Sequence, residues 1–245
     1  MVIAGIQKLT LLDYPGRLAA TVFTPGCNLR CPFCHNAPLV EEEGHAILTD
    51  GSNIPGCVEI EDALDFLKGR RGRLTGVAVT GGEPLMQQGI EDFLRRLKDL
   101  GYDIKLDTNG SYPEKLKAVI DEGLVDYIAM DLKNSWAKYP LTTGLKDSNA
   151  AQTVISAIKQ SAELLKNGPV SFEFRTTLVR ELHTAQDIEE MAKFVGPDYA
   201  YFLQCFKDSG AVLRNGYSAP DEETLKDYLE IAKKYSPKTQ LRGID

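Results

Sequence analysis

The sequence lacks long hydrophobic runs and any excess of basic charge. No stretch of its 245 residues approaches the roughly 20 apolar residues that span a bilayer, and residues 1–8 lack the basic head and apolar core of a secretion signal. We therefore expect a cytoplasmic protein. The 28 basic and 35 acidic residues give a net charge of −7, which argues against nucleic acids and anionic membranes as partners. A short basic run, residues 68–73, is interpreted as the solvated end of a helix.

The chain is also poor in cysteine and histidine, with five and three residues. An odd number of cysteines without a secretion signal favours metal binding over disulfides. Cys27, Cys31 and Cys34 follow the spacing C-x3-C-x2-C on a loop that begins with Pro-Gly. Thiolates hold iron–sulfur clusters, and a four-iron cluster held by three of them leaves one iron open for another ligand. Cys57 and Cys205 are isolated and are interpreted as ordinary small apolar residues.

Zinc is the alternative metal for these cysteines. His35 would complete a Cys3His set, which is an accepted structural zinc site. Structural zinc usually takes its ligands from two separated pairs, and adjacent residues such as Cys34 and His35 rarely point at one metal. The iron–sulfur interpretation is therefore favoured. The other two histidines, His45 and His183, are interpreted as surface residues rather than ligands.

Short apolar runs alternate with segments of helical period along the chain. Strands are predicted near residues 19–24, 74–80, 103–108, 125–131, 170–178 and 199–205. Helices are predicted from Ile90 to Gly101, from Pro113 to Gly123, near 150–167 and over about 220–236. Strand then helix, repeated about six times, requires parallel strands joined by crossover helices. The expected fold is α/β, a partial (β/α)6 TIM-type barrel over about 19–205, in a single domain of residues 1–245.

Glycines and charged residues follow the predicted strands at their carboxyl ends, where barrels of this type place their chemistry. Gly81 and Gly82 would let the backbone approach a ligand closely, and Glu83 is an acceptor at the barrel mouth. The next two strand ends carry Asp107 and Thr108, and then Asp131 and Lys133. Asp and Asn-Gly are also common in turns, but three charges around one mouth favour a binding site.

These residues together resemble the radical S-adenosylmethionine (radical SAM) superfamily. Its signature is the C-x3-C-x2-C spacing with an aromatic residue before the third cysteine, and Phe33 holds that place in the loop 25–36. Gly81-Gly82-Glu83-Pro84 resembles the GGEP motif that lies against the amino group of SAM. The resemblance implies a partial barrel and a SAM molecule bound to the open iron of a 4Fe-4S cluster. The implied cluster ligands are Cys27, Cys31 and Cys34.

The DTNG and D-x-K segments after the third and fourth predicted strands resemble the activating enzymes of glycyl radical proteins, a subset of the superfamily. The resemblance implies that Asp131 and Lys133 contact the SAM ribose and its surroundings. It also implies that Asp107, Thr108 and Asp131 line a site for a monovalent cation near the SAM carboxylate.

Two later strands carry further expected contacts. Arg175 matches an arginine that pairs with the SAM carboxylate, a task that suits a planar bidentate donor, whereas pairing with Glu173 is the alternative. The subset often has a histidine beside adenine near the end of the sixth strand. This chain has Gln204, Cys205 and Phe206 there, and Phe206 is the candidate for stacking on adenine.

Residues 9–17, LTLLDYPGR, and the cysteine loop resemble one branch, the activating proteins of anaerobic (class III) ribonucleoside-triphosphate reductase. No cysteine-rich insertion lies between the cysteines and residues 81–84, so activators with extra clusters are excluded. The branch implies that one electron, from a donor such as flavodoxin or ferredoxin, cleaves SAM to methionine and a 5′-deoxyadenosyl radical. That radical takes a hydrogen atom from a glycine of the partner enzyme. No catalytic triad is expected, because the cofactor supplies the hard chemistry.

Three alternatives remain open at this point. An activator of the pyruvate formate-lyase type would share the cluster and the SAM contacts. A small-molecule radical SAM enzyme, such as 7-carboxy-7-deazaguanine synthase, would share the cysteines and GGEP, whereas the Asp131-x-Lys133 pair favours an activator. A zinc or cluster scaffold without enzyme activity would keep the cysteines but would not need Glu83, Asp107 and Lys133 at strand ends.

Overall fold

The computed structural model describes residues 1–40, 57–208, 210 and 212–243. In this part of the chain one eight-stranded sheet follows the order of the sequence from β1 to β8. The strands are β1 (Gly5–Thr10), β2 (Ala19–Thr24), β3 (Gly76–Gly81), β4 (Asp103–Thr108), β5 (Tyr127–Asp131), β6 (Ser171–Leu178), β7 (Tyr201–Cys205) and β8 (Thr239–Arg242). β1 is antiparallel to β2, and every later pair of neighbours is parallel. The sheet is open, with β1 and β8 at its edges.

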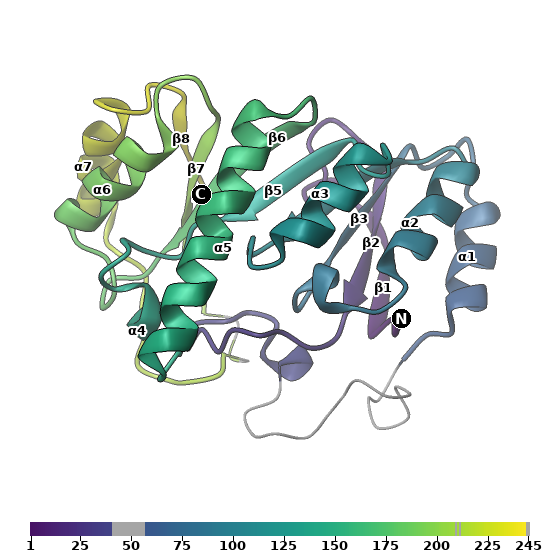
Figure 1. Cartoon of the computed structure of the whole chain (residues 1–245), viewed down its shortest axis with the longest axis horizontal. Coiled ribbons are helices and arrows are strands. Elements are labelled where there is room, and N and C mark those ends of the chain that lie inside the picture. The colour runs from purple at the N-terminus through teal and green to yellow at the C-terminus, as the bar shows by residue number, and fades with distance from the viewer. Residues whose placement is uncertain (41–56, 209, 211, 244–245) are drawn as a thin grey trace.

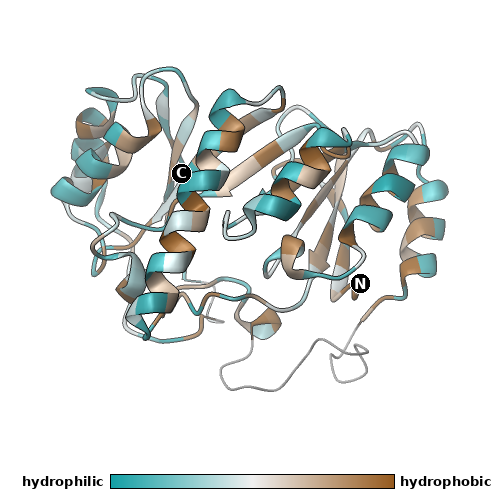
Figure 2. Ribbon diagram, viewed as in Figure 1, coloured by the Kyte–Doolittle hydropathy of each residue, from teal (hydrophilic) through white to brown (hydrophobic). Residues whose placement is uncertain are grey.

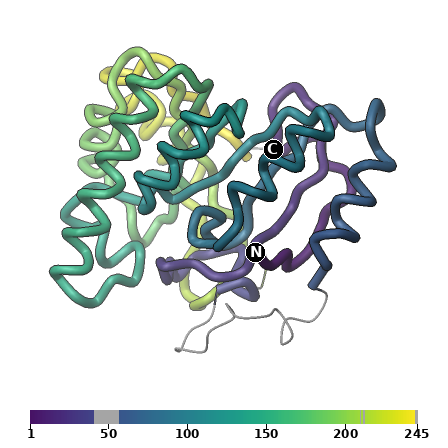
Figure 3. Tube along the Cα trace, turned by 45° about the vertical axis from the view of Figure 1, so that its right-hand side comes forward, coloured from purple at the N-terminus to yellow at the C-terminus, as the bar shows by residue number. Residues whose placement is uncertain are grey.

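Helices connect the parallel strands, because a tight turn cannot join parallel neighbours. The described residues form α1 (Ile60–Lys68), α2 (Ile90–Asp99), α3 (Pro113–Asp121), α4 (Tyr139–Thr143), α5 (Ser148–Asn167), α6 (Ala185–Val195) and α7 (Glu222–Lys233), with short 3-10 helices η1 (Ala37–Leu39) and η2 (Pro84–Met86). Figures 1 and 3 show α1, α2, α3 and α5 along one face of the curved sheet, with α6 and α7 continuing the row. None of these helices is long and apolar enough to cross a membrane.

The hydrophobic core lies between the sheet and these helices. Val77 and Val79 of β3 and Ile104 and Leu106 of β4 are fully buried. Each long helix adds one apolar stripe; that of α2 consists of Ile90, Phe93, Leu94 and Leu97. Figure 2 shows hydrophobic residues concentrated in the strands, whereas hydrophilic residues dominate the outward turns of the helices. The core therefore fixes the strands, and with them the position of every strand end.

The α/β class and the parallel sheet predicted from the sequence are confirmed. The six predicted strands correspond to β2 through β7, and the four predicted helices correspond to α2, α3, α5 and α7. The prediction misses both edge strands. In β1 the residues Gln7, Lys8 and Leu9 are all exposed, so no apolar run marks it, and β8 has only four residues.

The sequence pattern also did not predict α1, α4 and α6. For α6 a start signal exists, because Thr184 and Asp187 form a capping box in which each side chain bonds the backbone N–H of the other residue. Ile188 and Met191 follow at helical spacing and are buried. A Thr-x-x-Asp pair before such a run is therefore a usable signal for this helix.

The carboxyl ends of β2 to β7 meet at one edge of the sheet, at the bottom of Figure 1. The cysteine loop, residues 25–36, follows β2 directly and lies along this edge, as do residues 206–208 and 212–217 after β7. The two segments are joined by a hydrogen bond of 2.9 Å from the Arg214 N–H to the Pro32 carbonyl. The fold thus gathers the cysteine loop and the strand ends in one place.

Candidate active site

One cavity of about 230 Å³ lies at this edge and brings most of the predicted site residues together. The predicted residues that line it are Cys27, Cys31, Phe33, Cys34, Gly81, Gly82, Asp107, Thr108, Asp131, Lys133 and Arg175. Glu83 and Pro84 are buried and do not line it. Its wall also contains Asn36, Asn109, Thr177 and Gln204, which were not among the predicted site residues.

Gly81 and Gly82 hold the cysteine loop against the end of β3. The Gly82 N–H donates to the Thr24 carbonyl and the Glu83 N–H donates to the Gly26 carbonyl, both over 2.8 Å. A Cβ on Gly82 would lie 1.8 Å from the Gly26 oxygen. A Cβ on Gly81 would lie 2.4 Å from the Thr24 oxygen, and its φ of 118° is one that other residues rarely adopt. The close approach of two backbones therefore requires both glycines.

Glu83 is fully buried and joins the ends of β3 and β4. Its carboxylate accepts hydrogen bonds from Thr108 Oγ1 at 2.8 Å and from the N–H groups of Asn109 at 2.7 Å and Leu85 at 3.1 Å. Burial raises the pKa of Glu83 to about 7, although these hydrogen bonds act to lower it. Expected as an acceptor at the mouth, Glu83 instead holds the loop after β4 in position.

Replacing Glu83 with glutamine is expected to remove a pH dependence of stability. A carboxyl group whose pKa rises from 4.5 to about 7 on folding binds its proton more tightly in the folded state. The free energy of unfolding therefore falls as pH rises through this window. Glu83→Gln removes the buried charge, so it should gain about 2 kcal/mol over the parent between pH 5 and pH 7.5. Urea unfolding of both proteins across this range measures the difference, and parallel curves would contradict it.

Charged side chains at the strand ends bind one another around the cavity. Arg175 Nε donates to Asp131 at 3.0 Å, and Arg175 Nη1 donates to Asp107 at 3.2 Å. Lys133 Nζ donates to Asp131 at 2.8 Å, and Lys105, which sequence reasoning missed, bonds Asp107. Burial alone would raise the pKa of Asp131, but the charges of Arg175 and Lys133 lower it to about 2. Asp131 therefore stays ionised, and both carboxylates have cationic partners.

Arg175 pairs across strands and not with its neighbour on β6. Glu173 binds Arg242 of β8 at 2.6 and 2.8 Å, so the alternative pairing considered from the sequence is not formed. Burial acts to lower the pKa of Arg175, and the charges of Asp107 and Asp131 raise it. Arg175 is thus a fixed cation on the cavity wall, a group suited to binding a carboxylate.

The three residues expected to line a monovalent-cation site already have protein partners. Asp107 and Asp131 both accept from Arg175, and Thr108 Oγ1 donates to Glu83. A cation would have to displace these donors from the carboxylates. The monovalent-cation site stays a prediction, with both carboxylates bound to Arg175 in this structure.

The three cysteines are free thiols packed in apolar surroundings. Cys31 belongs to a cluster of buried residues with Leu29, Phe33, Val179, Leu182 and Phe206, against which Cys27 and Cys34 pack. Burial raises the pKa of Cys27 to about 11 and that of Cys31 to about 12, and it raises the pKa of Cys34 as well. Without a metal these thiols are protonated at neutral pH, so metal binding must release their protons.

The placement of these cysteines fits an iron–sulfur cluster better than a zinc ion. Among the residues that the structure describes, no three His, Cys, Asp or Glu side chains converge closely enough to hold one metal ion. A four-iron cluster meets each thiolate through a different iron, so its ligands surround a wider space. The cavity that all three cysteines share supplies such a space. His35, the fourth ligand of the zinc alternative, also lines this cavity, and its ring lies beside that of Phe206 with centroids 5.3 Å apart.

Asn109 is a site residue that sequence reasoning missed. Its Nδ2 donates to Cys27 Sγ over 3.7 Å and to Asn28 Oδ1 over 3.0 Å. Its Oδ1 accepts from the backbone N–H and the hydroxyl of Ser111, at 2.9 and 2.5 Å, which turns the amide N–H group toward the cysteine. The sequence signal was an Asn-Gly pair after a strand, which by itself marks only a turn.

Gln204, rather than Phe206, lines the cavity at the end of β7. Phe206 is 2% exposed, and its ring packs edge-on against Phe33 with centroids 6.4 Å apart. Phe206 thus packs against Phe33 of the cysteine loop and does not line the cavity. Cys205 is partly buried between them and does not line the cavity.

The expectation that His183 is a surface residue is wrong. Its side chain is buried, with Nε2 2.9 Å from the Lys133 carbonyl and Nδ1 3.1 Å from the Val179 N–H. Burial lowers the pKa of His183, so the ring is neutral at pH 7. His183 therefore holds the loop after β5 in place and is not a ligand, as expected. His45 lies outside the described residues.

Residues 9–17, which carry the resemblance to one branch, lie at the opposite end of β2 from the cysteines. Asp13 accepts a hydrogen bond of 2.5 Å from Thr21 Oγ1. Tyr14 is buried against Gly76, where a Cβ would lie 2.8 Å from the tyrosine ring. Asp13 and Tyr14 are therefore explained by packing at this end of the sheet, whereas Leu9, Leu11 and Leu12 are 56%, 67% and 89% exposed and packing does not explain them.

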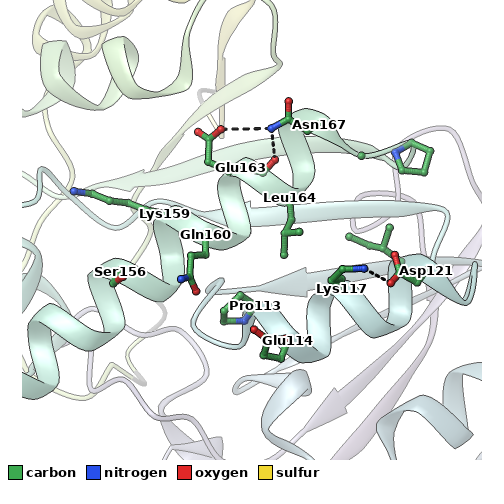
Figure 4. Close-up of a pocket in the computed structure, with 13 residues that line it drawn as sticks. Pro113, Glu114, Lys117, Asp121, Ser156, Lys159, Gln160, Glu163, Leu164 and Asn167 are labelled. Atoms are coloured by element: carbon green, nitrogen blue, oxygen red, sulfur yellow. Dashed lines mark hydrogen bonds and ion pairs between the residues drawn. The ribbon is translucent and has the colours of Figure 1, made fainter.

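A wider cavity of about 770 Å³ lies between α3 and α5, where Figure 4 shows its lining side chains. Its polar groups bind one another, with Lys117 bound to Asp121 and Asn167 Nδ2 3.5 Å from the Glu163 carboxylate. It contains none of the predicted site residues. The cavity at the strand ends is therefore the candidate active site.

The Radical SAM superfamily profile matches residues 21–195. This range contains the three cysteines and the strand ends from β3 to β6, and the chain belongs to the Radical SAM superfamily. The family uses a 4Fe-4S cluster and S-adenosylmethionine. The expected cofactors are thereby confirmed.

The relatives include activators and a small-molecule enzyme. A Methanocaldococcus jannaschii protein with the provisional name glycyl-radical enzyme activating enzyme is 31% identical over 246 residues, 99% of this chain and 96% of that protein. The 7-carboxy-7-deazaguanine synthase of Methanopyrus kandleri is 30% identical over 133 residues, 49% of this chain and 51% of that enzyme. A domain of pyruvate-formate lyase-activating enzyme from Bacteroides vulgatus has the same fold, with a TM-score of 0.53, 20% identity and coverage of 69% and 99%.

Proposed function

We propose that this protein is an activating enzyme that reductively cleaves SAM at a 4Fe-4S cluster and generates a glycyl radical on a partner enzyme. The observation that carries the proposal is the single cavity that Cys27, Cys31 and Cys34 share with Lys133 and Arg175. The three thiolates would hold the cluster and leave one iron for SAM. The similarity over nearly the whole length to a glycyl-radical activating relative supports this choice within the superfamily.

When bound, the cluster and SAM would supply the hard chemistry, which is the one-electron cleavage of SAM and the removal of a hydrogen atom from a glycine of the partner. The task of this chain is to orient SAM and to exclude water. We assign Arg175 to the SAM carboxylate and the Gly81-Gly82 backbone to its amino group. Asp131 and Lys133 are assigned to the ribose, and Gln204 to the side of adenine, because all of them line the cavity.

The partner that we propose is anaerobic ribonucleoside-triphosphate reductase, and the electron donor is a flavodoxin or ferredoxin. The resemblance of residues 9–17 supports this partner. Because these residues lie at the end of β2 opposite the cysteines, the support is a sequence resemblance and not a contact with the cavity. A cytoplasmic location is part of the proposal, since reducing conditions keep such thiols free.

A small-molecule enzyme is the second candidate, because 7-carboxy-7-deazaguanine synthase matches half of the chain. It would use the same cysteines and the same SAM contacts. The activator is favoured because the glycyl-radical activating relative matches 99% of the chain, whereas the synthase matches 49% of it.

The test begins with anaerobic reconstitution of the cluster, followed by dithionite and SAM. We expect 5′-deoxyadenosine, and a glycyl radical doublet in electron paramagnetic resonance once the host's anaerobic ribonucleotide reductase is added. Zinc in place of iron, or no 5′-deoxyadenosine, would reject the radical chemistry. A doublet with another glycyl radical enzyme alone would reassign the partner, and deazapurine formation without any doublet would favour the second candidate.

Replacing Asn109 with alanine is expected to make the reduction potential of the cluster more negative. An N–H donor to a cluster thiolate stabilises the reduced, more negative state, and Asn109 supplies one to Cys27. We also expect SAM cleavage to slow by about 10- to 100-fold, as for other groups that orient metal ligands. A potentiometric titration followed by electron paramagnetic resonance measures the potential. Asn167→Ala, an exposed site on α5, is the control, and equal potentials in both variants would refute the role of Asn109.

A further inference from the structure

A cationic cavity adjoins the cysteine loop outside the SAM site. It has a volume of about 400 Å³ and is lined by Arg30, Pro140, Leu141, Gly144, Leu145, Lys146, Leu213 and Arg214. Three of these residues are cations and none is acidic. The chain as a whole carries a net charge of −7, so this surface is positively charged on a protein that is negative overall.

Among the described residues, the three cations of this cavity have no ionic partner. Within the described part of the chain, no ion pair involves Arg30, Lys146 or Arg214. The acid next in sequence, Asp147, caps α5 by accepting a hydrogen bond of 2.7 Å from the Ala150 N–H. The positive charge of the cavity is therefore available to a binding partner.

The cavity is built on the backbone of the cysteine loop. The Arg30 N–H donates to the Thr143 carbonyl at 2.8 Å, and the Arg30 guanidinium donates to the Cys27 carbonyl. On the other wall, the Arg214 N–H donates to the Pro32 carbonyl at 2.9 Å. Leu145 packs against the buried cluster that contains Cys31. A molecule bound in this cavity would thus lie directly against the loop that carries the three sulfur atoms.

We propose that this cationic cavity is the docking surface of an acidic, low-potential one-electron carrier protein. The inference rests on the proposed function, because the cluster must receive one electron before SAM is cleaved. The carrier loses that electron and the cluster gains it, with no bond made or broken between them. SAM would occupy the other cavity beside the cysteines, which leaves this face of the loop for the electron carrier.

The composition of the surface suits a transient protein partner. Leu141 is 69% exposed, and Leu213 and Leu145 also line the cavity, so the surface combines apolar side chains with its cations. The unpaired cations around these leucines would attract an acidic carrier and speed its association. The same argument excludes a cationic partner from this surface.

The test compares a chemical reductant with a protein reductant. Lys146→Glu/Arg214→Glu reverses two exposed charges on side chains that are not assigned to the cluster or to SAM. With dithionite, which needs no docking, we expect unchanged 5′-deoxyadenosine formation. With a reduced acidic ferredoxin as the donor, we expect kcat/KM for ferredoxin to fall by about tenfold or more and its dependence on ionic strength to flatten.

Arg71→Glu/Arg73→Glu is the matched control. It makes the same change in net charge on exposed residues that precede β3, at the opposite end of the sheet. We expect this control to keep the ferredoxin kinetics of the parent. Equal losses in both double variants, or unchanged kinetics in the first, would overturn the inference.

Two other binding partners of this surface would also overturn the inference. If Lys146→Glu/Arg214→Glu accepts electrons normally but no longer forms the glycyl radical, the surface binds the glycyl radical enzyme. If the variant changes the oligomeric state in gel filtration, the surface binds a second copy of this chain. Failure of the parent to cleave SAM with dithionite would instead refute the proposed function, and this inference with it.

Discussion

Replacing Cys27, Cys31 or Cys34 with alanine is expected to abolish iron binding and SAM cleavage while the fold remains. All three thiols line one cavity, and each would hold a different iron of the cluster. Removing a group that only orients a metal ligand lowers metal affinity or activity by about 10- to 100-fold. Loss of a ligand itself should therefore lower 5′-deoxyadenosine formation by more than about 100-fold. Iron content, the absorption of the reconstituted protein and 5′-deoxyadenosine yield measure the effect.

Cys205→Ala is the matched control for these variants. Cys205 is a partly buried thiol at the same edge of the sheet, but it does not line the cavity. It should keep about four irons per chain and the activity of the parent. Full activity in any one of the three cavity variants would refute the assignment of that cysteine as a ligand.

Replacing Gly82 with alanine is expected to separate the cysteine loop from the sheet. The new Cβ would lie 1.8 Å from the Gly26 oxygen, and both atoms belong to backbone that is held by neighbouring hydrogen bonds. Overpacking of this kind destabilises proteins by about 1–3 kcal/mol. Because the contacting atoms belong to rigid backbone, the loss of stability in Gly82→Ala should lie near the upper limit of this range. The bond from the Glu83 N–H to Gly26 would break as well, so cluster retention should fall together with stability.

Urea unfolding and iron content after reconstitution test this expectation. Gly5→Ala in β1 is the control, because its Cβ would meet nothing within 4 Å and its φ is not positive. The control should match the parent in both measurements. If Gly82→Ala keeps both the cluster and the stability of the parent, the cysteine loop can move away from β3 without loss of stability. That result would contradict the expectation.

The sheet was predictable because its inner strands are short apolar runs bounded by glycine, proline or aspartate. Those endings also marked Gly81, Asp107 and Asp131, since parallel strands bring their carboxyl ends to one edge. β1 and β8 were not predictable in the same way. β1 exposes one edge to solvent and so has mixed polarity, and β8 is too short for a pattern.

Other site residues could not be predicted because their neighbours come from different strands. Asn109 faces Cys27 only because β4 lies beside β3 and because buried Glu83 holds the Asn109 backbone. Gln204 reaches the cavity because β7 is next to β6 in the sheet. The sequence likewise predicted a surface position for His183, because its hydrogen-bond partner, the Lys133 carbonyl, lies on another loop.

The sequence by itself determined the class of fold and predicted the sulfur donors of the cluster. Three cysteines at C-x3-C-x2-C specify the sulfur ligands locally, because all three lie on one short loop and need no distant partner to be found. The tertiary structure alone decided what surrounds that loop. It placed the cationic wall of Lys133 and Arg175 on one side and the unpaired cations of Lys146 and Arg214 on another. Such groupings depend on the order and register of strands, which no local spacing encodes.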